Sequence, residues 1–117
     1  MITLKLQHNT DKSPVKFRAF YQNIEPHGVY YTINETSEKL PGFIYKTITF
    51  NNPLYIPFKD WKKELSRKYK AKGKILTKKL LKAGFDGILT QDKNNNFLEI
   101  VNLKEFQENY KDNRKLI

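Results

Sequence analysis

Residues 85–103, FDGILTQDKNNNFLEIVNL, decide the fold of this chain. The two ends of the stretch, 85–90 and 97–103, are rich in aromatic, β-branched and other large apolar residues, which predicts two strands. The polar run between them, 91–96, predicts a hairpin loop. Gly84 precedes the stretch at the position where a helix commonly ends with a glycine cap. The sequence therefore predicts a β-hairpin that directly follows a helix.

Two helices are predicted before this hairpin. Trp61, Leu65 and Tyr69 recur every four residues, which predicts a helix with one apolar stripe and a basic remainder. Gly73 interrupts this pattern, and the leucine-rich residues 75–81 define a second helix. Because Trp61 and Tyr69 lie on the apolar stripe, we expect them in the core rather than as stacking platforms for a nucleic acid.

The other patterns along the chain complete an α+β arrangement. They predict an alternating strand at 2–6 that runs into 8–10, an irregular or helical piece at 15–20, strands at 29–32, 43–50 and 54–56, one or two helical turns at 34–38, and a last short helix at 104–112. The elements do not repeat in strict βαβ alternation, which favours an α+β fold over a doubly wound sheet. We expect residues 1–117 to form a single domain of ordinary size.

The composition excludes several kinds of site. The chain has 117 residues and no cysteine, so it has no disulfide, thiolate zinc site or thiol nucleophile. Its two histidines, His8 and His27, are too few for a convincing metal site, and we expect no metal. We see no secretory signal at the N-terminus and no run near the about 18 apolar residues of a membrane-spanning helix. We therefore expect a cytoplasmic protein.

The charge of the chain points to an acidic partner. Lysine and arginine number 22 against 12 acidic residues, which gives a net charge of +10, and eleven of the 22 lie in the segment 59–82. Such a density raises the local concentration of polyanions or acidic protein surfaces. The alternative is a solvated helical face without a partner. The candidate partner-binding residues of the segment are Lys62, Lys63, Arg67, Lys70 and Lys78.

Three local patterns follow one another in an order that resembles a known family. His8-Asn9-Thr10 ends the first strand, Gly28-Val29-Tyr30-Tyr31-Thr32 opens the second, and Gly84-Phe85-Asp86-Gly87-Ile88 precedes the strand that holds Glu99. This order resembles the compact ADP-ribosyltransferase-like domains of phage and mobile-element proteins. The part from Ala83 to Leu103 is also similar to anti-CRISPR proteins of the ADP-ribosyltransferase type.

The resemblance implies a fold and a reaction. The fold is a split β-sandwich with a few short helices, which holds extended NAD in a cleft between two sheets. The reaction transfers ADP-ribose from NAD, with loss of nicotinamide, to a macromolecule of the host or of its defence. Positive charge develops on the ribose as nicotinamide leaves, so a fixed carboxylate beside it stabilises the transition state.

Glu99 is the candidate for this catalytic carboxylate. Side chains two residues apart on a strand share a face, so we expect Glu99 to lie between the apolar side chains of Phe97 and Val101. A charge in that setting favours a functional role. The alternative is that Glu99 is the solvent-facing residue of an alternating strand.

The resemblance also implies residues that bind NAD. Tyr30 resembles the aromatic residue that stacks on the nicotinamide ring, and Tyr31, on the opposite face, takes its place if the register differs by one. His8 resembles the histidine that holds the adenine-side ribose, with Asn9 and Thr10 beside it. Either tyrosine is otherwise an ordinary strand aromatic, and His8 is otherwise a satisfied polar group at a strand end. Arg18 is the rival of His8, because one branch of the superfamily uses an arginine in the first strand.

Two departures from the family pattern leave a second function open. Asn9 stands where these domains commonly have glycine, and Phe97 stands where arginine-directed enzymes have Glu or Gln, which disfavours an arginine acceptor. In the anti-CRISPR members the carboxylate falls two positions later, at Val101, so the site of this chain is shifted or lost if it follows them. The alternative function is a catalytically inactive module of the same fold that binds nucleic acid or an acidic protein through its basic helices.

Overall fold

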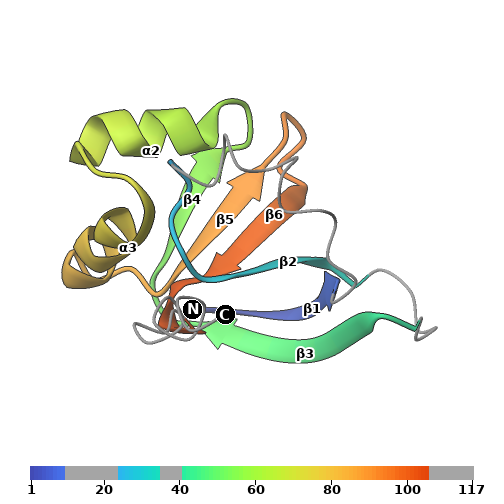
Figure 1. Ribbon diagram of the computed structural model, residues 1–117. Helices are drawn as coiled ribbons and strands as arrows, with labels where there is room; N and C mark the ends of the chain where they lie inside the picture. The colour runs from blue at the N-terminus through green and yellow to red at the C-terminus, as the bar shows by residue number, and fades with distance from the viewer. Residues whose placement is uncertain (10–23, 35–40, 106–117) are drawn as a thin grey trace.

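A computed structural model of the chain describes residues 1–9, 24–34 and 41–105, with nothing described for the side chain of Asn9. The described residues form an α+β fold, as expected: a six-stranded mixed sheet in the order β3-β1-β2-β6-β5-β4, with two α-helices. The elements are β1 (Ile2–Asn9), β2 (Val29–Ile33), β3 (Phe43–Phe50), β4 (Pro53–Pro57), α2 (Trp61–Tyr69), α3 (Gly73–Lys82), β5 (Gly87–Gln91), β6 (Phe97–Asn102) and the short 3₁₀ helix η2 (Leu103–Glu105). Figure 1 shows both α-helices beside the half of the sheet that holds β4, β5 and β6.

The predicted hairpin is confirmed as the antiparallel pair β5 and β6. β5 begins at Gly87 rather than at residue 85, because Phe85 and Asp86 belong to the turn that leaves α3. The pairing places Leu89 opposite Ile100 and is then irregular as far as Gln91. This irregularity breaks the strict alternation of side chains between the two faces of the sheet.

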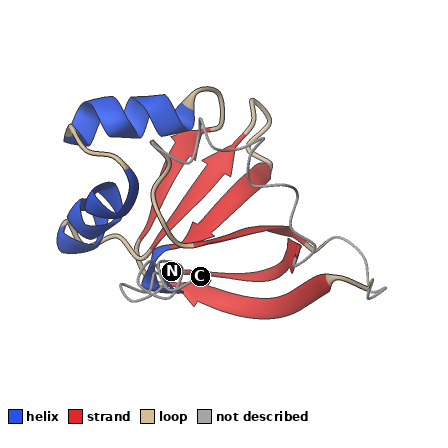
Figure 2. Ribbon diagram, viewed as in Figure 1, coloured by secondary structure: helices blue, strands red, loops and turns tan. Residues whose placement is uncertain are grey.

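β4 and β5 run parallel to each other, and α2 and α3 make the connection between them. The described residues therefore contain a β-helix-β crossover, although their elements do not follow strict βαβ alternation. α2 ends at Tyr69, where Lys70 adopts a left-handed conformation, and Gly73 is the first residue of α3 rather than only an interruption. Figure 2 shows the helices on one side of the strands.

Two hydrophobic clusters lie on opposite faces of the sheet. The first lies between the sheet and the helices and contains Trp61, Leu65, Leu76, Leu80, Ile88 and Val101. The second joins the two halves of the sheet and contains Leu6, Tyr31, Phe50, Leu89 and Ile100. Trp61 is a core residue of the first cluster, as predicted, and the partly buried Tyr69 packs against the same cluster. Ile75, by contrast, is exposed rather than part of the apolar face of α3.

The Gly84-Phe85-Asp86-Gly87 turn, which precedes β5, is held by hydrogen bonds to the residues that precede β4. The buried carboxylate of Asp86 accepts hydrogen bonds from the backbone N–H groups of Asn51 and Asn52, at 2.6 and 3.1 Å. Gly84 has a φ of 100°, a conformation that favours glycine. A β-carbon at Gly87 would lie 2.4 Å from the ring of Phe50, so this position has no room for a side chain. The motif that carries the family resemblance therefore has a structural role here.

Several expectations fall outside the described residues. They concern the helical piece at 15–20, the helical turns beyond Asn34 and the helix beyond Glu105. The candidate residues Thr10 and Arg18 also lie outside the described residues. None of the helices in the described ranges has the length and the apolar character needed to cross a membrane.

Candidate functional site

Glu99 lies on the helix-covered face of the sheet and is a half-buried residue. The indole N–H of Trp61, the first residue of α2, donates a hydrogen bond to Oε1 of Glu99 at 3.0 Å. Trp61 itself is only 2% exposed, so its packing fixes the direction of this bond. Glu99 is therefore an oriented carboxylate rather than a freely solvated side chain.

Phe97 does not share this face, contrary to the expectation from strand alternation. Val101 belongs to the cluster under the helices, whereas Phe97 packs against the cluster on the opposite face. The irregular pairing near Gln91 is the physical reason, because it turns the start of β6 relative to its end. Trp61 thus takes the place beside Glu99 that was expected for Phe97.

Tyr30 lies on the same face as Glu99 and packs against Trp61, with ring centroids 6.3 Å apart. Its hydroxyl group donates a hydrogen bond to the carbonyl of Pro26 at 2.7 Å, which fixes the ring. The ammonium of Lys62 lies 5.7 Å from the centroids of both rings. The same ammonium pairs with the buried carboxylate of Glu25 at 2.8 Å. Two carboxylates, one cation and two aromatic rings therefore meet at the start of α2.

His8 and Tyr31 lie on the other face of the sheet. Their rings meet edge to face with centroids 5.7 Å apart, and Nδ1 of His8 hydrogen-bonds the carbonyl oxygen of Tyr30 at 2.7 Å. The hydroxyl of Tyr31 donates to Glu105 at 2.6 Å, and Lys46 pairs with the same carboxylate at 3.0 Å. Burial, and then the contact with Glu105, raise the pKa of Tyr31 far above its ordinary value, so the hydroxyl stays protonated near neutral pH.

The structure therefore brings together some of the expected site residues and separates others. Glu99 and Tyr30 share one face, whereas His8 and Tyr31 share the opposite face. Asn9 contributes its backbone to β1, opposite Phe43.

The expected partner-binding residues do not all reach solvent. Lys63, Arg67, Lys70 and Lys78 are exposed on α2, α3 and the turn between them. Lys62 points inward, and its side chain is only 17% exposed because it pairs with Glu25. Arg67 pairs with Glu64 at 3.2 Å on the helix surface. The outer side of the helices is thus basic, with Lys62 removed from it.

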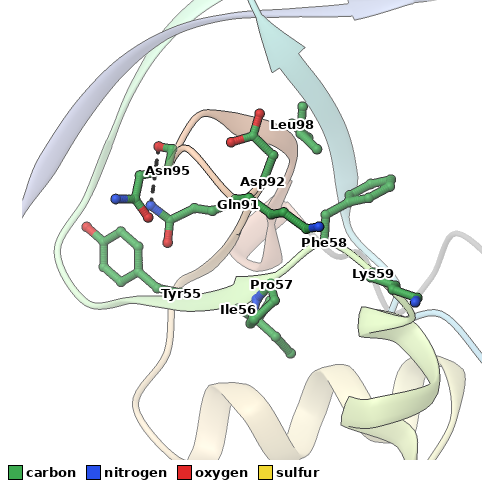
Figure 3. A pocket seen from close by; sticks show the side chains of 10 residues that line it. Tyr55, Ile56, Pro57, Phe58, Lys59, Gln91, Asp92, Asn95 and Leu98 are labelled. Atoms are coloured by element: carbon green, nitrogen blue, oxygen red, sulfur yellow. Dashed lines mark hydrogen bonds between the residues drawn. The ribbon is translucent and has the colours of Figure 1, made fainter.

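A surface depression of about 510 Å³ lies at the end of the sheet where β4 and β5 finish and the 92–96 loop begins. Figure 3 shows its lining, which includes the side chains of Tyr55, Phe58, Lys59, Gln91 and Leu98. None of His8, Tyr30 or Glu99 lines it. Sequence reasoning missed this depression. The aromatic residues that flank Pro57 in the run 53–58, PLYIPF, were the one available signal.

Within the described residues, no three or more His, Cys, Asp or Glu side chains gather in a way that could hold a metal ion. Comparison with protein-family models, with curated proteins and with solved structures finds no match to this chain.

Proposed function

We propose that this chain is an NAD-dependent mono-ADP-ribosyltransferase of the ADP-ribosyltransferase-like split β-sandwich type, with Glu99 as its catalytic carboxylate. Its target would be a macromolecule of a host cell or of its defence, because the order of its motifs resembles that of phage and mobile-element domains. The observation that carries the proposal is the carboxylate of the half-buried Glu99, held by the indole of Trp61. Such a preoriented charge stabilises a developing cation without reorganising during the reaction.

The transfer reaction needs no general acid from the protein, because its leaving group is neutral. The bond between the ribose C1 and the nicotinamide nitrogen breaks, its electron pair stays on nitrogen, and nicotinamide leaves as a neutral ring. The acceptor nucleophile then bonds to C1 and loses its proton. Tyr30 supports the proposal as the aromatic ring on the same face as Glu99. Because His8 lies on the face of the sheet opposite to Glu99, we leave the adenine-side ribose without an assigned histidine contact.

The test is release of nicotinamide from NAD, followed by chromatography, in the purified wild-type chain and in Glu99→Gln. We expect the substitution to lower the rate about a hundredfold or more, because an oriented charge that acts in the transition state contributes on this scale. Glu64→Gln, which removes an exposed carboxylate of α2, is the matched control and leaves the rate unchanged. Equal rates in wild type and Glu99→Gln, or no release by the wild type, would exclude Glu99 from this role.

A second function is favoured by the exposed cations on the outer side of α2 and α3. Lys63, Arg67, Lys70 and Lys78 present positive charge from adjacent elements, and the chain as a whole carries +10. An inactive module of the same fold would use this surface to bind a nucleic acid or an acidic protein. Binding through phosphates falls with salt, with a slope of about −0.9 per phosphate on duplex DNA. Affinity that does not change with salt would exclude this mode.

A further inference from the structure

Exposed apolar side chains gather at the depression beside β4. Tyr55, Phe58 and Leu98 line it and are 50%, 43% and 37% exposed. They are half of the six large hydrophobic side chains that are exposed in the described ranges. Exposed apolar residues that gather at one place usually mark a site that binds a ligand, another macromolecule or a membrane. The volume of about 510 Å³ lies within the range of small-ligand sites, about 300–1,000 Å³.

The walls of this depression are held in place by hydrogen bonds. The backbone N–H of Phe58 donates to the carbonyl of Gln91 at 2.9 Å, which ties the turn after β4 to the end of β5. The carboxylate of Asp92 accepts from the backbone N–H groups of Asn94 and Asn96, at 2.8 and 2.9 Å, and so shapes the loop. The ring of Tyr55 lies 6.3 Å from the ring of Phe97. The exposed rings are thus presented by a preorganised surface, which lowers the cost of binding.

The charges around the depression favour an anionic occupant. Lys59 and Lys93 line it, and the one acidic side chain in the lining, Asp92, is engaged with the loop backbone. The hydrogen bonds from Asn96 and Asn94 lower the pKa of Asp92, so its carboxylate stays ionised, and two lysines against this one carboxylate leave the lining with a net charge of +1. Lys59 lies four residues before Lys63, the first exposed cation of α2. Lys59 is thus close in the chain to the basic outer side of α2, with the exposed Asp60 between them.

We propose that this depression, with the rings of Tyr55 and Phe58 and the ammonium groups of Lys59 and Lys93, binds single-stranded nucleic acid. Unpaired bases stack on exposed aromatic rings, and lysines bind the phosphates between them. The amides of Gln91 and Asn95, also in the lining, offer donors and acceptors to base edges. A duplex keeps its base faces stacked on one another, so its bases cannot reach these rings. The site contains neither Glu99 nor Tyr30, so this proposal does not depend on the transfer reaction proposed above.

The experiment measures fluorescence anisotropy of a labelled oligouridine and a labelled oligothymidine of about 12 nucleotides, and of a duplex of equal length. We expect tighter binding of the single strands, with an affinity that falls as salt rises from about 50 to about 200 mM. Tyr55→Ala and Phe58→Ala should each weaken binding by about fivefold to a hundredfold, the range for loss of one stacked base. Tyr55→Phe, which keeps the ring, should bind like the wild type.

The controls separate this site from the basic helices and from folding. Ile75→Ala removes an exposed apolar side chain of α3 and should leave binding unchanged. The emission of the single tryptophan, Trp61, which is buried, reports whether each variant is folded. Wild-type affinity in the two alanine variants, with loss in Lys63→Gln and Arg67→Gln, would overturn the proposal in favour of the helices alone. Equal binding of the duplex, or equal competition by an acidic polypeptide such as polyglutamate, would also overturn it.

Discussion

Removing the carboxylate of Asp86 should destabilise the whole fold. This side chain is 6% exposed and accepts two backbone hydrogen bonds, from Asn51 at 2.6 Å and from Asn52 at 3.1 Å. A hydrogen bond to a charged group contributes about 1.5–3 kcal/mol, and donors left without a partner add their desolvation cost. Asn51 and Asn52 are themselves exposed, so water recovers part of the loss in Asp86→Ala. We therefore expect the free energy of unfolding to fall by about 2–4 kcal/mol.

The assay is urea unfolding followed by the emission of Trp61. With a slope of about 2 kcal/mol per molar urea, the expected loss moves the midpoint down by about 1–2 M. Asp86→Asn keeps one acceptor oxygen and should lose about half as much as Asp86→Ala. The matched control is Asp92→Ala, which also removes a carboxylate bonded to two backbone N–H groups, but in an exposed loop. Because water replaces the lost acceptor there, its effect should be clearly smaller.

Two results would refute this reasoning. One is an unfolding free energy in Asp86→Ala within about 0.5 kcal/mol of the wild type, the usual size of a neutral surface change. The other is an equal loss in Asp92→Ala, which would mean that burial of the Asp86 carboxylate has no energetic weight.

Two further predictions concern Gly87, which lies against Phe50 of the second hydrophobic cluster, and the carboxylate of Glu105, which accepts the hydrogen bond from Tyr31. Gly87→Ala should cost about 1–3 kcal/mol, since its β-carbon would lie 2.4 Å from the ring of Phe50, and this cost should shrink in a Phe50→Leu background measured by the same urea assay. An unchanged cost in that background would mean that the ring is not the obstacle. Burial opposes ionisation of Glu105, but hydrogen bonds from Tyr31, Lys46 and Asn102 outweigh it and lower its pKa. The stabilisation of the fold by ionised Glu105 is therefore complete above the pKa of about 4.3 in the unfolded chain, and it is lost as pH falls through the lower pKa of the folded chain. The difference in unfolding free energy between wild type and Glu105→Gln should then narrow from about pH 7 to below about pH 4. A constant difference would contradict this.

The candidate site was only partly predictable. Glu99 and Tyr30 were chosen because the motifs around them resemble those of a known family, and the structure places both on one face of the sheet. The pairing of Lys62 with Glu25 could not be predicted, because it joins α2 to a loop that precedes β2 in the chain. The sequence gives no information on how two such distant segments are placed.

By itself, the sequence determined the local elements of this protein. The aromatic and β-branched run 43–50 matched β3 residue for residue, and the periodicity of residues 61–69 predicted α2 but not its end before Gly73. Both follow from backbone preferences and the spacing of apolar side chains, which are properties of short segments. Gly84 likewise marked the end of the second helix, and the polar run 91–96 marked the loop of the hairpin.

Only the tertiary structure decided what these elements do together. The order of the strands, the parallel pairing of β4 with β5 and the irregular start of β6 depend on contacts between distant segments. That irregular start turned Phe97 away from Glu99, and the packing of α2 put Trp61 in its place. The physical reason is that the face on which a side chain lies follows from local alternation only while the ladder is regular, whereas its neighbour across the core is set by how the whole sheet buries its apolar surface.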